Sequence, residues 1–425
     1  MVKQGVLLRE LQSIAGKKHA REPKNDECSV DSLSPQAIVE PGTYEEVAEV
    51  LRFANTERLA VIPRGAGMQT TLGNIPTRYD ITLGLTRLDK VIEHEPADLT
   101  VTCQAGISVG ALGGLLAESE QIVPLTLNPA PADPPTVGGL LSLNTSYMRM
   151  THGSPREFTI GLKVITADGR ISRAGGKVVK NVAGYDLCKL YIGSRGTLAV
   201  IVEATFKLFP RPQTQGSVSL EFADADAACR VALQTQSRGL AVFDAHVTRP
   251  ADDARDVTAR QSLYLLHLTS AGDASAVERC LQEARHLAGK AGGTPFGAPL
   301  RTSAAAVQFA EHPLSVRARL LPTQVPAFIH AVESHAVGPL DASPLLGEIN
   351  WLSVKGGDQR KWIESARLTA SSVGGTLEVQ FCSPELKRQI DVFGPPPPSF
   401  PLMRAIKQQF DPNNVLSPGR FVGRL

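Results

Sequence analysis

Cysteines are few in this sequence and lie far apart. The chain has six: Cys28, Cys103, Cys188, Cys229, Cys280 and Cys382. No pair has the Cys-x-x-Cys spacing that is typical of zinc, iron–sulfur and redox-disulfide sites. The sequence therefore argues against those kinds of site and favours reduced, structural thiols in a cytoplasmic protein.

The sequence also has no large excess of charge of either sign and no long apolar run. The 44 basic and 42 acidic residues leave a net charge of +2, which is not the footprint of a nucleic-acid-binding protein. No apolar run approaches the roughly 18 residues that span a membrane. Residues 1–30 mix charges with apolar positions and lack the core of a signal peptide. We therefore expect membrane association only through a partner.

The familiar phosphate motifs are missing as well, although one loop resembles them in composition. The stretch "PRGAGMQTTLG", Pro63 to Gly73, has neither the Lys-Ser/Thr end of a Walker loop nor a Gly-x-Gly-x-x-Gly fingerprint. It follows a strand at 37–41, a helix that begins at the capping box Thr43-x-x-Glu46, and a buried strand at 59–63. Ligands tend to bind at the ends of such strands.

The side chains and glycines of this loop suit an anion. Gly65, Ala66 and Gly67 would let successive N–H groups converge, Arg64 would add charge, and the hydroxyl of Thr70 follows. Taken alone, however, a Gly-x-Gly after a strand is more often a plain turn.

A second glycine cluster, "PPTVGGLLSLNTS", lies in a stretch that we expect to be irregular. Thr136, Gly138 and Gly139 offer a hydroxyl and closely approaching N–H groups, and short polar side chains follow at 144–146. A plain Gly-Gly bend is about as frequent in such a setting. After it, the segments from Phe158 to Pro212 have strand and turn character.

Length and patterning predict more than one domain, because 425 residues exceed the roughly 250 to 300 at which a single core stops growing. We expect an N-terminal helix and linker (1–35), a ligand-binding domain (36–212), and a cap (213–393). A Pro-rich linker, a helix and a tail follow (394–425). Alternating strands and helices in the cap predict an α+β fold with an antiparallel sheet.

These motifs together resemble one family. The order "PRGAGMQT", "TVGGLLSLNTS", "HGSPREFTIGLKVITADG" and "KNVAGYDLCKLYIGSRGTLAVIVEATFKLFPRP" is similar to the FAD-binding domain of the vanillyl-alcohol oxidase and p-cresol methylhydroxylase (PCMH) superfamily. The last stretch and the tail "FDPNNVLSPGRF" resemble the 2-hydroxy-acid-oxidising branch, and "KNVAGYDL" resembles the FAD-binding subunit of bacterial glycolate oxidase. The resemblance implies an α+β protein with a two-lobed PCMH-type FAD-binding domain and a C-terminal α+β cap.

The resemblance also implies FAD-binding residues. The pyrophosphate site would comprise Arg64, Gly65, Ala66, Gly67, Met68, Gln69, Thr70, Thr136, Val137, Gly138 and Gly139. The ribityl chain and flavin would lie beside Asn144, Thr145, Ser146, His152 and Gly153, while Gly196 and Ile201 would lie near the adenosine end.

The sequence departs from the family in ways that bear on function. Met68 and Gln69 stand where some relatives carry a His that binds the flavin covalently, so we expect noncovalent FAD. The segment "TSYMRMTHG" is bulkier than usual. The His-x-Gly-Asp-Gly-Asn-x-His metal signature of relatives that oxidise 2-hydroxy acids directly is missing, and no metal site is expected. His246 and His267 lie in predicted strands, where hydrogen-bonded structural histidines are the better interpretation.

Oxidation of a hydroxy acid needs a carboxylate anchor and a base for the hydroxyl proton. Arg420 and Arg156 are candidate anchors, and His152 is the candidate base. The alternatives are phosphate-pairing or exposed arginines and a histidine that packs on the flavin, and these are favoured because spacing identifies no second catalytic group.

Three functional hypotheses follow. The first is the FAD-binding subunit of a glycolate-oxidase-type complex that oxidises glycolate or D-lactate. Its partners would be a second flavoprotein subunit with the metal signature and an iron–sulfur subunit, and it would be cytoplasmic or peripheral to the inner membrane through the complex. The second is a self-sufficient FAD-dependent 2-hydroxy-acid dehydrogenase. The third is a flavin-free scaffold.

Overall fold

In the computed structural model, the chain forms two compact units. Among the described residues, those from 4 to 211 and from 395 to 425 belong to unit one, and those from 212 to 394 belong to unit two. The structure describes residues 4–125, 135–144, 152–177, 184–249, 263–297, 314–333, 339–353 and 357–425. Among these residues, no helix is both long and apolar enough to cross a membrane.

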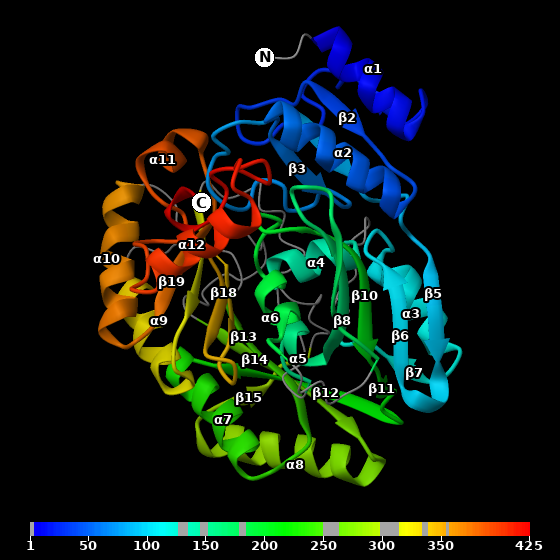
Figure 1. Cartoon of the computed structure of the whole chain (residues 1–425). Helices are drawn as coiled ribbons and strands as arrows, with labels where there is room; N and C mark the ends of the chain where they lie inside the picture. The colour runs from blue at the N-terminus through cyan, green and yellow to red at the C-terminus, as the bar shows by residue number, and fades with distance from the viewer. Residues whose placement is uncertain are drawn as a thin grey trace. The chain divides into compact units, whose positions relative to one another are not determined.

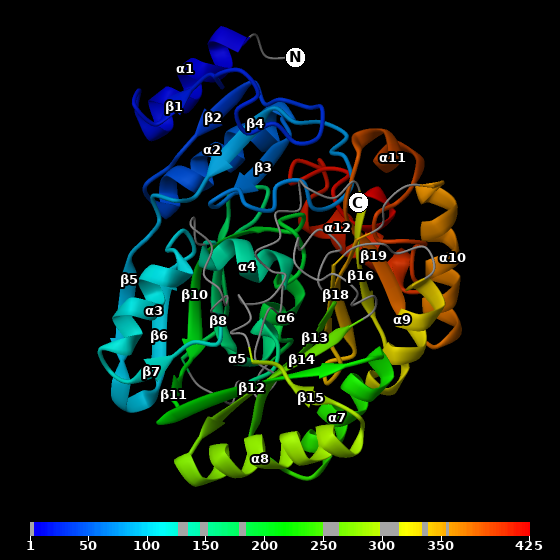
Figure 2. The same ribbon diagram turned by 180° about the vertical axis from the view of Figure 1, so that it is seen from behind.

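Unit one begins with a small sheet whose strands run in the order β1-β2-β4-β3. Its strands are β1 (Ala20–Arg21), β2 (Ala37–Val39), β3 (Val61–Arg64) and β4 (Ile81–Gly84), and its helices are α1 (Gln4–Ala15) and α2 (Tyr44–Glu57). β2 and β3 both pair parallel with β4. Figure 1 and Figure 2 show α2 alongside this sheet, and its apolar side chains share a core with the strands. The Thr43 hydroxyl accepts from the N–H of Glu46, which confirms the predicted helix start.

The second sheet of unit one is antiparallel, in the order β5-β6-β10-β8-β9. Its strands are β5 (Val91–Glu95), β6 (Thr100–Gln104), β8 (Thr159–Ile165), β9 (Ile171–Gly175) and β10 (Val200–Lys207). The remaining elements of the unit are η1 (Pro96–Asp98), α3 (Val109–Ala117), β7 (Gln121–Ile122), α4 (Val137–Leu143), α5 (Pro155–Phe158), α6 (Leu187–Tyr191), β11 (Phe209–Pro210), α12 (Phe400–Phe410) and η5 (Val422–Arg424).

Two local predictions in unit one were wrong. The stretch after Thr136 is not irregular but forms helix α4, because the Thr136 hydroxyl caps it by accepting from the N–H of Gly139. The stretch after Asp186 is not strand and turn but helix α6, where the Asp186 carboxylate accepts from the N–H of Lys189. In the first segment the capping hydrogen bond favours a helix despite the two glycines, and in the second it favours a helix where the apolar residues suggested a strand.

Unit two is built on an eight-stranded sheet in the order β15-β12-β14-β13-β17-β18-β16-β19. The strands are β12 (Thr214–Phe222), β13 (Val242–Arg249), β14 (Tyr264–Gly272), β15 (Thr294–Pro295), β16 (Leu314–Arg319), β17 (Leu340–Ser343), β18 (Glu348–Ser353) and β19 (Thr376–Cys382). Its helices are α7 (Ala225–Ser237), α8 (Ala274–Lys290), η4 (Pro322–Gln324), α9 (Val325–Glu333), α10 (Gln359–Ser372) and α11 (Pro384–Gln389). All the pairings between these strands are antiparallel.

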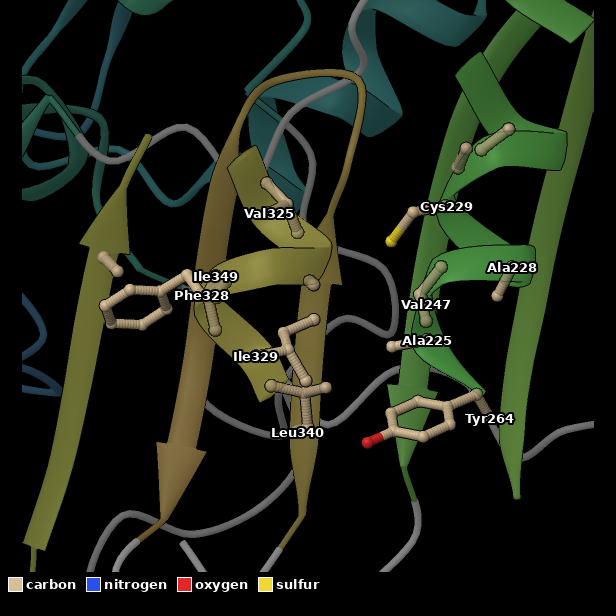
Figure 3. Close-up of a cluster of buried hydrophobic side chains, with 14 of the residues drawn as sticks. Ala225, Ala228, Cys229, Val247, Tyr264, Val325, Phe328, Ile329, Leu340 and Ile349 are labelled. Atoms are coloured by element: carbon tan, nitrogen blue, oxygen red, sulfur yellow. The ribbon is translucent and has the colours of Figure 1, made fainter. Parts of the chain in front are cut away.

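Side chains from the helices and from alternate strand positions of unit two form one hydrophobic core. Figure 3 shows Cys229 of α7 beside Val247 of β13, and Phe328 and Ile329 of α9 beside Ile349 and Leu340 of the sheet. The sheet and its covering helices confirm the predicted α+β cap, and the two units together confirm the predicted fold class.

Candidate functional site

The glycine loop, defined here as residues 65–74, begins where β3 ends. In the described residues, the backbone N–H groups of Gly65, Ala66, Gly67 and Met68 donate to no backbone or side-chain acceptor. Gly67 has a φ of 81°, a left-handed conformation that a glycine adopts without strain. Consecutive N–H groups with left-handed turns between them form concave anion-binding sites. The loop therefore offers a row of donors to an anionic group.

Arg64 lies at the start of this loop and carries a buried donor. Its Nη1 lies 2.6 Å from Cys28 Sγ. Its Nε is buried and has no hydrogen-bond partner within the described part of the chain. A buried donor of this kind costs roughly 1–3 kcal/mol when it is left unsatisfied. An anion bound in the glycine loop would supply the acceptor.

A hollow opens over the glycine loop, with an empty volume of about 870 Å³ that includes solvent at its mouth. Its walls are residues 62–70, Leu72, Pro135, Thr136, Gly139, Leu140, Ser142, Leu143, Arg195, Ser417 and Arg420. No His or Cys is among these lining residues. We call it the first hollow. It brings together a row of backbone donors, guanidinium groups and an apolar wall.

An adjoining second hollow shares several of these walls. Arg64, Gly65, Thr136, Gly139 and Arg195 line both. The second hollow continues to the start of β10 and is also lined by Leu85, Ala105, Gly138, Gly196, Ala199, Val200 and Ile201. The predicted adenosine-end residues therefore lie along the same walls as the predicted pyrophosphate residues, which suits an extended ligand.

The two glycine clusters pack directly against each other. A β-carbon on Gly65 would collide with the Thr136 hydroxyl, and one on Gly138 would lie 2.9 Å from the β-carbon of Ala105. The N–H of Gly138 already donates to the Ala105 carbonyl at 2.7 Å, and that of Gly139 to the Thr136 hydroxyl at 3.3 Å. Both N–H groups are therefore occupied within the chain, and the place of Gly138 and Gly139 at the ligand stays a prediction. The cluster forms a closely packed wall of the hollow.

Arg420 lines the first hollow, but its guanidinium is occupied. Nη2 donates to the carbonyls of Thr70 and Leu72 at 2.6 and 2.5 Å, and Nη1 donates to that of Asn74 at 3.3 Å. The residue is only 7% exposed, and this burial lowers its pKa to about 10. These bonds favour a role in holding the glycine loop over the predicted role as a carboxylate anchor.

The other predicted catalytic residues lie away from the first hollow. His152 is half-buried, and its ring meets Phe209 edge to face with centroids 4.3 Å apart. Arg156 donates through Nη2 to the Ile192 carbonyl at 2.7 Å. Gly153 packs on the carboxylate of Glu157, which caps α5. None of these residues lines either hollow.

Four further predicted cofactor-binding residues can be placed only in part. Asn144 ends α4 in a left-handed conformation, and its Oδ1 is buried without a partner among the described residues. Val137 is fully buried, and its N–H donates to the Ile107 carbonyl, so it supports the wall without lining it. Thr145 and Ser146 lie outside the described residues.

Sequence reasoning missed Arg195, Ser142 and Ser417, which all line the first hollow. The Arg195 N–H donates to the Ser142 carbonyl at 2.8 Å, which fixes the loop of residues 193–198 against α4. The available signal for Arg195 was its place between Ser194 and Gly196 in a glycine-rich loop. No local signal marks Ser142, since it faces the hollow only because α4 is helical.

In unit two, His246 lies between two carboxylates. Its Nδ1 is 2.9 Å from Asp341 Oδ1, and its Nε2 is 3.1 Å from Asp244 Oδ2. The neighbouring His267 bonds through Nδ1 to the Ser219 hydroxyl at 2.8 Å. Both are therefore hydrogen-bonded strand histidines, as predicted. Over the residues with described coordinates, no group of His, Cys, Asp and Glu is arranged to hold a metal ion.

Known proteins resemble this chain in sequence. Residues 35–175 match the family described as "FAD binding domain", and residues 396–421 match "FAD linked oxidases, C-terminal domain". Glycolate oxidase subunit GlcD of Bacillus subtilis (strain 168) is 26% identical over 92% of this chain and 89% of its own length.

Two dehydrogenases match about half of the chain. D-2-hydroxyglutarate dehydrogenase of Xanthomonas citri pv. viticola is 34% identical over 47% of this chain and 42% of its own length. D-lactate dehydrogenase of Archaeoglobus fulgidus is 32% identical over 48% of this chain and 45% of its own length. These matches thus span less than half of either dehydrogenase.

Solved structures share the fold along nearly the whole chain. Alkyldihydroxyacetonephosphate synthase aligns with a TM-score of 0.71 at 16% identity, covering 98% of this chain and 85% of its own. p-Cresol methylhydroxylase with substrate bound aligns with a TM-score of 0.71 at 14% identity, covering 99% and 97%.

Proposed function

Because the chain belongs to the FAD-linked oxidases, we propose that it is the FAD-binding subunit of a glycolate-oxidase-type complex. It is an FAD-dependent oxidoreductase that acts on CH–OH donors of the 2-hydroxy acid class. Beyond this activity, we propose that the substrate is glycolate or D-lactate and that the chain works with partner subunits. The support for this proposal is the similarity to the GlcD subunit, which extends over 92% of this chain.

The residues present fit FAD. The observation that carries this assignment is the row of N–H groups from Gly65 to Met68, which donate to no acceptor among the described residues, beside the buried Nε of Arg64. We propose that these donors hold the two phosphates, since charge-assisted hydrogen bonds contribute roughly 1.5–3 kcal/mol each and need no lysine. Gly196 and Ile201 would line the adenosine end in the second hollow.

Bound FAD would supply the acceptor for the hydride that leaves the hydroxyl-bearing carbon of the substrate. The chain's own residues bind and orient the cofactor, and Leu72, Leu140 and Leu143 give the hollow an apolar wall that limits water. We propose His152 as the base that accepts the hydroxyl proton. Arg156 and Arg420 donate to backbone carbonyls, which favours positioning roles for both.

The proposed partners follow from what the sequence lacks. It has no His-x-Gly-Asp-Gly-Asn-x-His run to bind a substrate-holding metal and no closely spaced cysteines for an iron–sulfur cluster. We therefore propose a second flavoprotein subunit that carries the metal signature and an iron–sulfur subunit that receives the electrons.

Anaerobic reduction tests this proposal. The purified chain and the complex recovered with its neighbours would each be mixed with glycolate and the D and L forms of lactate, and loss of flavin absorbance would be followed. We expect fast bleaching only in the complex. Fast bleaching of the lone chain would contradict the subunit proposal and support the alternative, a self-sufficient dehydrogenase. The similarity to a D-2-hydroxyglutarate dehydrogenase and a D-lactate dehydrogenase is the observation that favours this alternative. A colourless protein that binds no FAD would support the flavin-free scaffold.

A further inference from the structure

The C-terminal segment supplies two buried cations to the loops that line the hollows. Lys407 of α12 is 6% exposed and Arg420 of the tail is 7% exposed. Lys407 donates to a backbone carbonyl in the loop of residues 193–198, and Arg420 donates to backbone carbonyls in the glycine loop. The two loops are more than a hundred residues apart in the sequence, and this segment joins them.

Lys407 is fully engaged. Its Nζ donates to the carbonyls of Thr197 and Leu416, both at 2.9 Å, and to Asp411 Oδ2 at 2.6 Å. Asp411 in turn accepts from the N–H groups of Val415 and Leu416. An ammonium group has three donors, so none remains for a ligand. The group therefore fixes the Thr197 carbonyl, next to Gly196 of the second hollow, to α12 and the tail.

Arg420 holds the glycine loop in the same way. Its guanidinium donates to the Thr70, Leu72 and Asn74 carbonyls, and the side-chain amide of Asn74 donates back to the Phe421 carbonyl at 2.9 Å. The fork of a guanidinium reaches several acceptors at once, which an ammonium cannot do in the same geometry. Three carbonyls of the glycine loop are thereby held against the tail.

The tail is itself anchored to the strand that leads into the glycine loop. The N–H of Val61 donates to the Val415 carbonyl at 2.8 Å, and that of Ser417 donates to the Val61 carbonyl at 2.9 Å. Ser417 and Arg420 also line the first hollow. The tail and β3 thus form one support, which carries Arg420 and to which Lys407 of α12 is bonded through the Leu416 carbonyl.

We propose that Lys407 and Arg420 are positioning residues that set the FAD affinity by holding the two loops, and not by attracting the diphosphate through their charge. The proposal rests on FAD as the cofactor and is independent of the substrate and of the partner subunits. A failure of the glycolate-oxidase assignment would leave it untouched.

The experiment measures the dissociation constant of FAD by flavin fluorescence, with the full-length apoprotein at low and high salt. We expect Arg420→Met and Lys407→Met to weaken binding about ten- to a hundredfold, as the loss of buried hydrogen bonds allows. The control is Arg404→Met, which removes an exposed cation from the same helix. It should leave the affinity unchanged.

Arg420→Lys separates positioning from charge. A positioning role predicts that lysine fails to restore the affinity and that the loss in Arg420→Met is the same at both salt concentrations. Restoration by lysine, or a loss that disappears in high salt, would mean attraction by charge and would overturn the proposal. So would unchanged affinity in folded Arg420→Met or Lys407→Met. If the methionine variants do not fold without FAD, the milder Arg420→Lys decides, with apoprotein melting as the check.

Discussion

Gly65 packs against Thr136 so closely that a β-carbon on Gly65 would collide with the Thr136 hydroxyl. Thr136 is 4% exposed and caps α4 through that same hydroxyl. The contact therefore joins the glycine loop to the helix that forms the opposite wall of the first hollow. Neither residue can move without disturbing the row of donors.

Gly65→Ala should therefore weaken FAD binding at least about tenfold, since the displaced loop can no longer direct its N–H groups at one anion. Titration of the apoprotein with FAD measures the effect. Gly114→Ala is the matched control, because a β-carbon there meets nothing within 4 Å. Alanine at that helical position should preserve FAD binding and raise stability by roughly 0.5–1 kcal/mol. Equal affinities in both variants would contradict the close-packing argument.

Much of the glycine loop was predictable from the sequence because its signals are local. Residues 63–73 carry their glycines, their arginine and their preceding strand within one short stretch. The role of Arg420 was not predictable, because its acceptors lie at Thr70 to Asn74 and only the tertiary fold brings them to the tail. Arg195 was missed for the same reason.

The wrong prediction of irregular backbone after Thr136 has a cause in the neighbouring residues. The glycines after Thr136 suggested irregular backbone, yet a capping hydroxyl and the apolar side chains of Leu140 and Leu141 stabilise a helix there. The N–H groups of Gly138 and Gly139, which were expected at the ligand, donate instead to the Ala105 carbonyl and to the capping hydroxyl of Thr136. By contrast, the helix after Thr43 was predicted correctly because its cap and its apolar periodicity agree.

Arg64→Met tests the buried guanidinium. If Nε donates to the diphosphate, its loss removes a charge-assisted bond, and FAD should bind about ten- to a hundredfold more weakly. The melting temperature of the apoprotein should fall only by what the Nη1 contact with Cys28 Sγ contributes, since Nε has no protein partner in the described residues. Arg87→Met removes an exposed arginine that donates to the Glu40 carbonyl and serves as control. A large fall in apoprotein stability with unchanged FAD affinity would make Arg64 a structural residue.

FAD should leave the protein on denaturation. No His or Cys lines the first hollow among the residues that the structure describes, and Met68 and Gln69 occupy the loop. Acid precipitation should therefore release all of the flavin into the supernatant, and the denatured chain should carry no flavin fluorescence in a gel. A fluorescent band would show a covalent bond and identify the attached peptide on digestion.

His152→Asn should separate catalysis from cofactor binding. Asparagine keeps a similar shape beside Phe209 but cannot accept the proton, and a positioned general base contributes about a hundred- to ten-thousandfold to rate. Flavin reduction by the substrate in the complex should slow by that factor while the FAD dissociation constant stays within twofold. A parallel loss of FAD would instead assign His152 to flavin packing. An unchanged rate would remove it from the mechanism.

The cap should lose stability as the pH rises. Burial alone lowers the pKa of His246, but Asp244 and Asp341 outweigh it and hold the pKa well above the usual 6.5, while burial and the charge of His246 lower the pKa of His267 on the adjacent strand. A raised folded-state pKa gives stability that is complete below about pH 6.5 and is lost as the pH climbs through the folded value. Unfolding by urea from pH 6 upward should follow that decline. Asp341→Asn should cost roughly 1–3 kcal/mol at pH 6 and flatten the pH dependence. A wild-type stability that does not fall across this range would show that His246 is not charged in the folded cap.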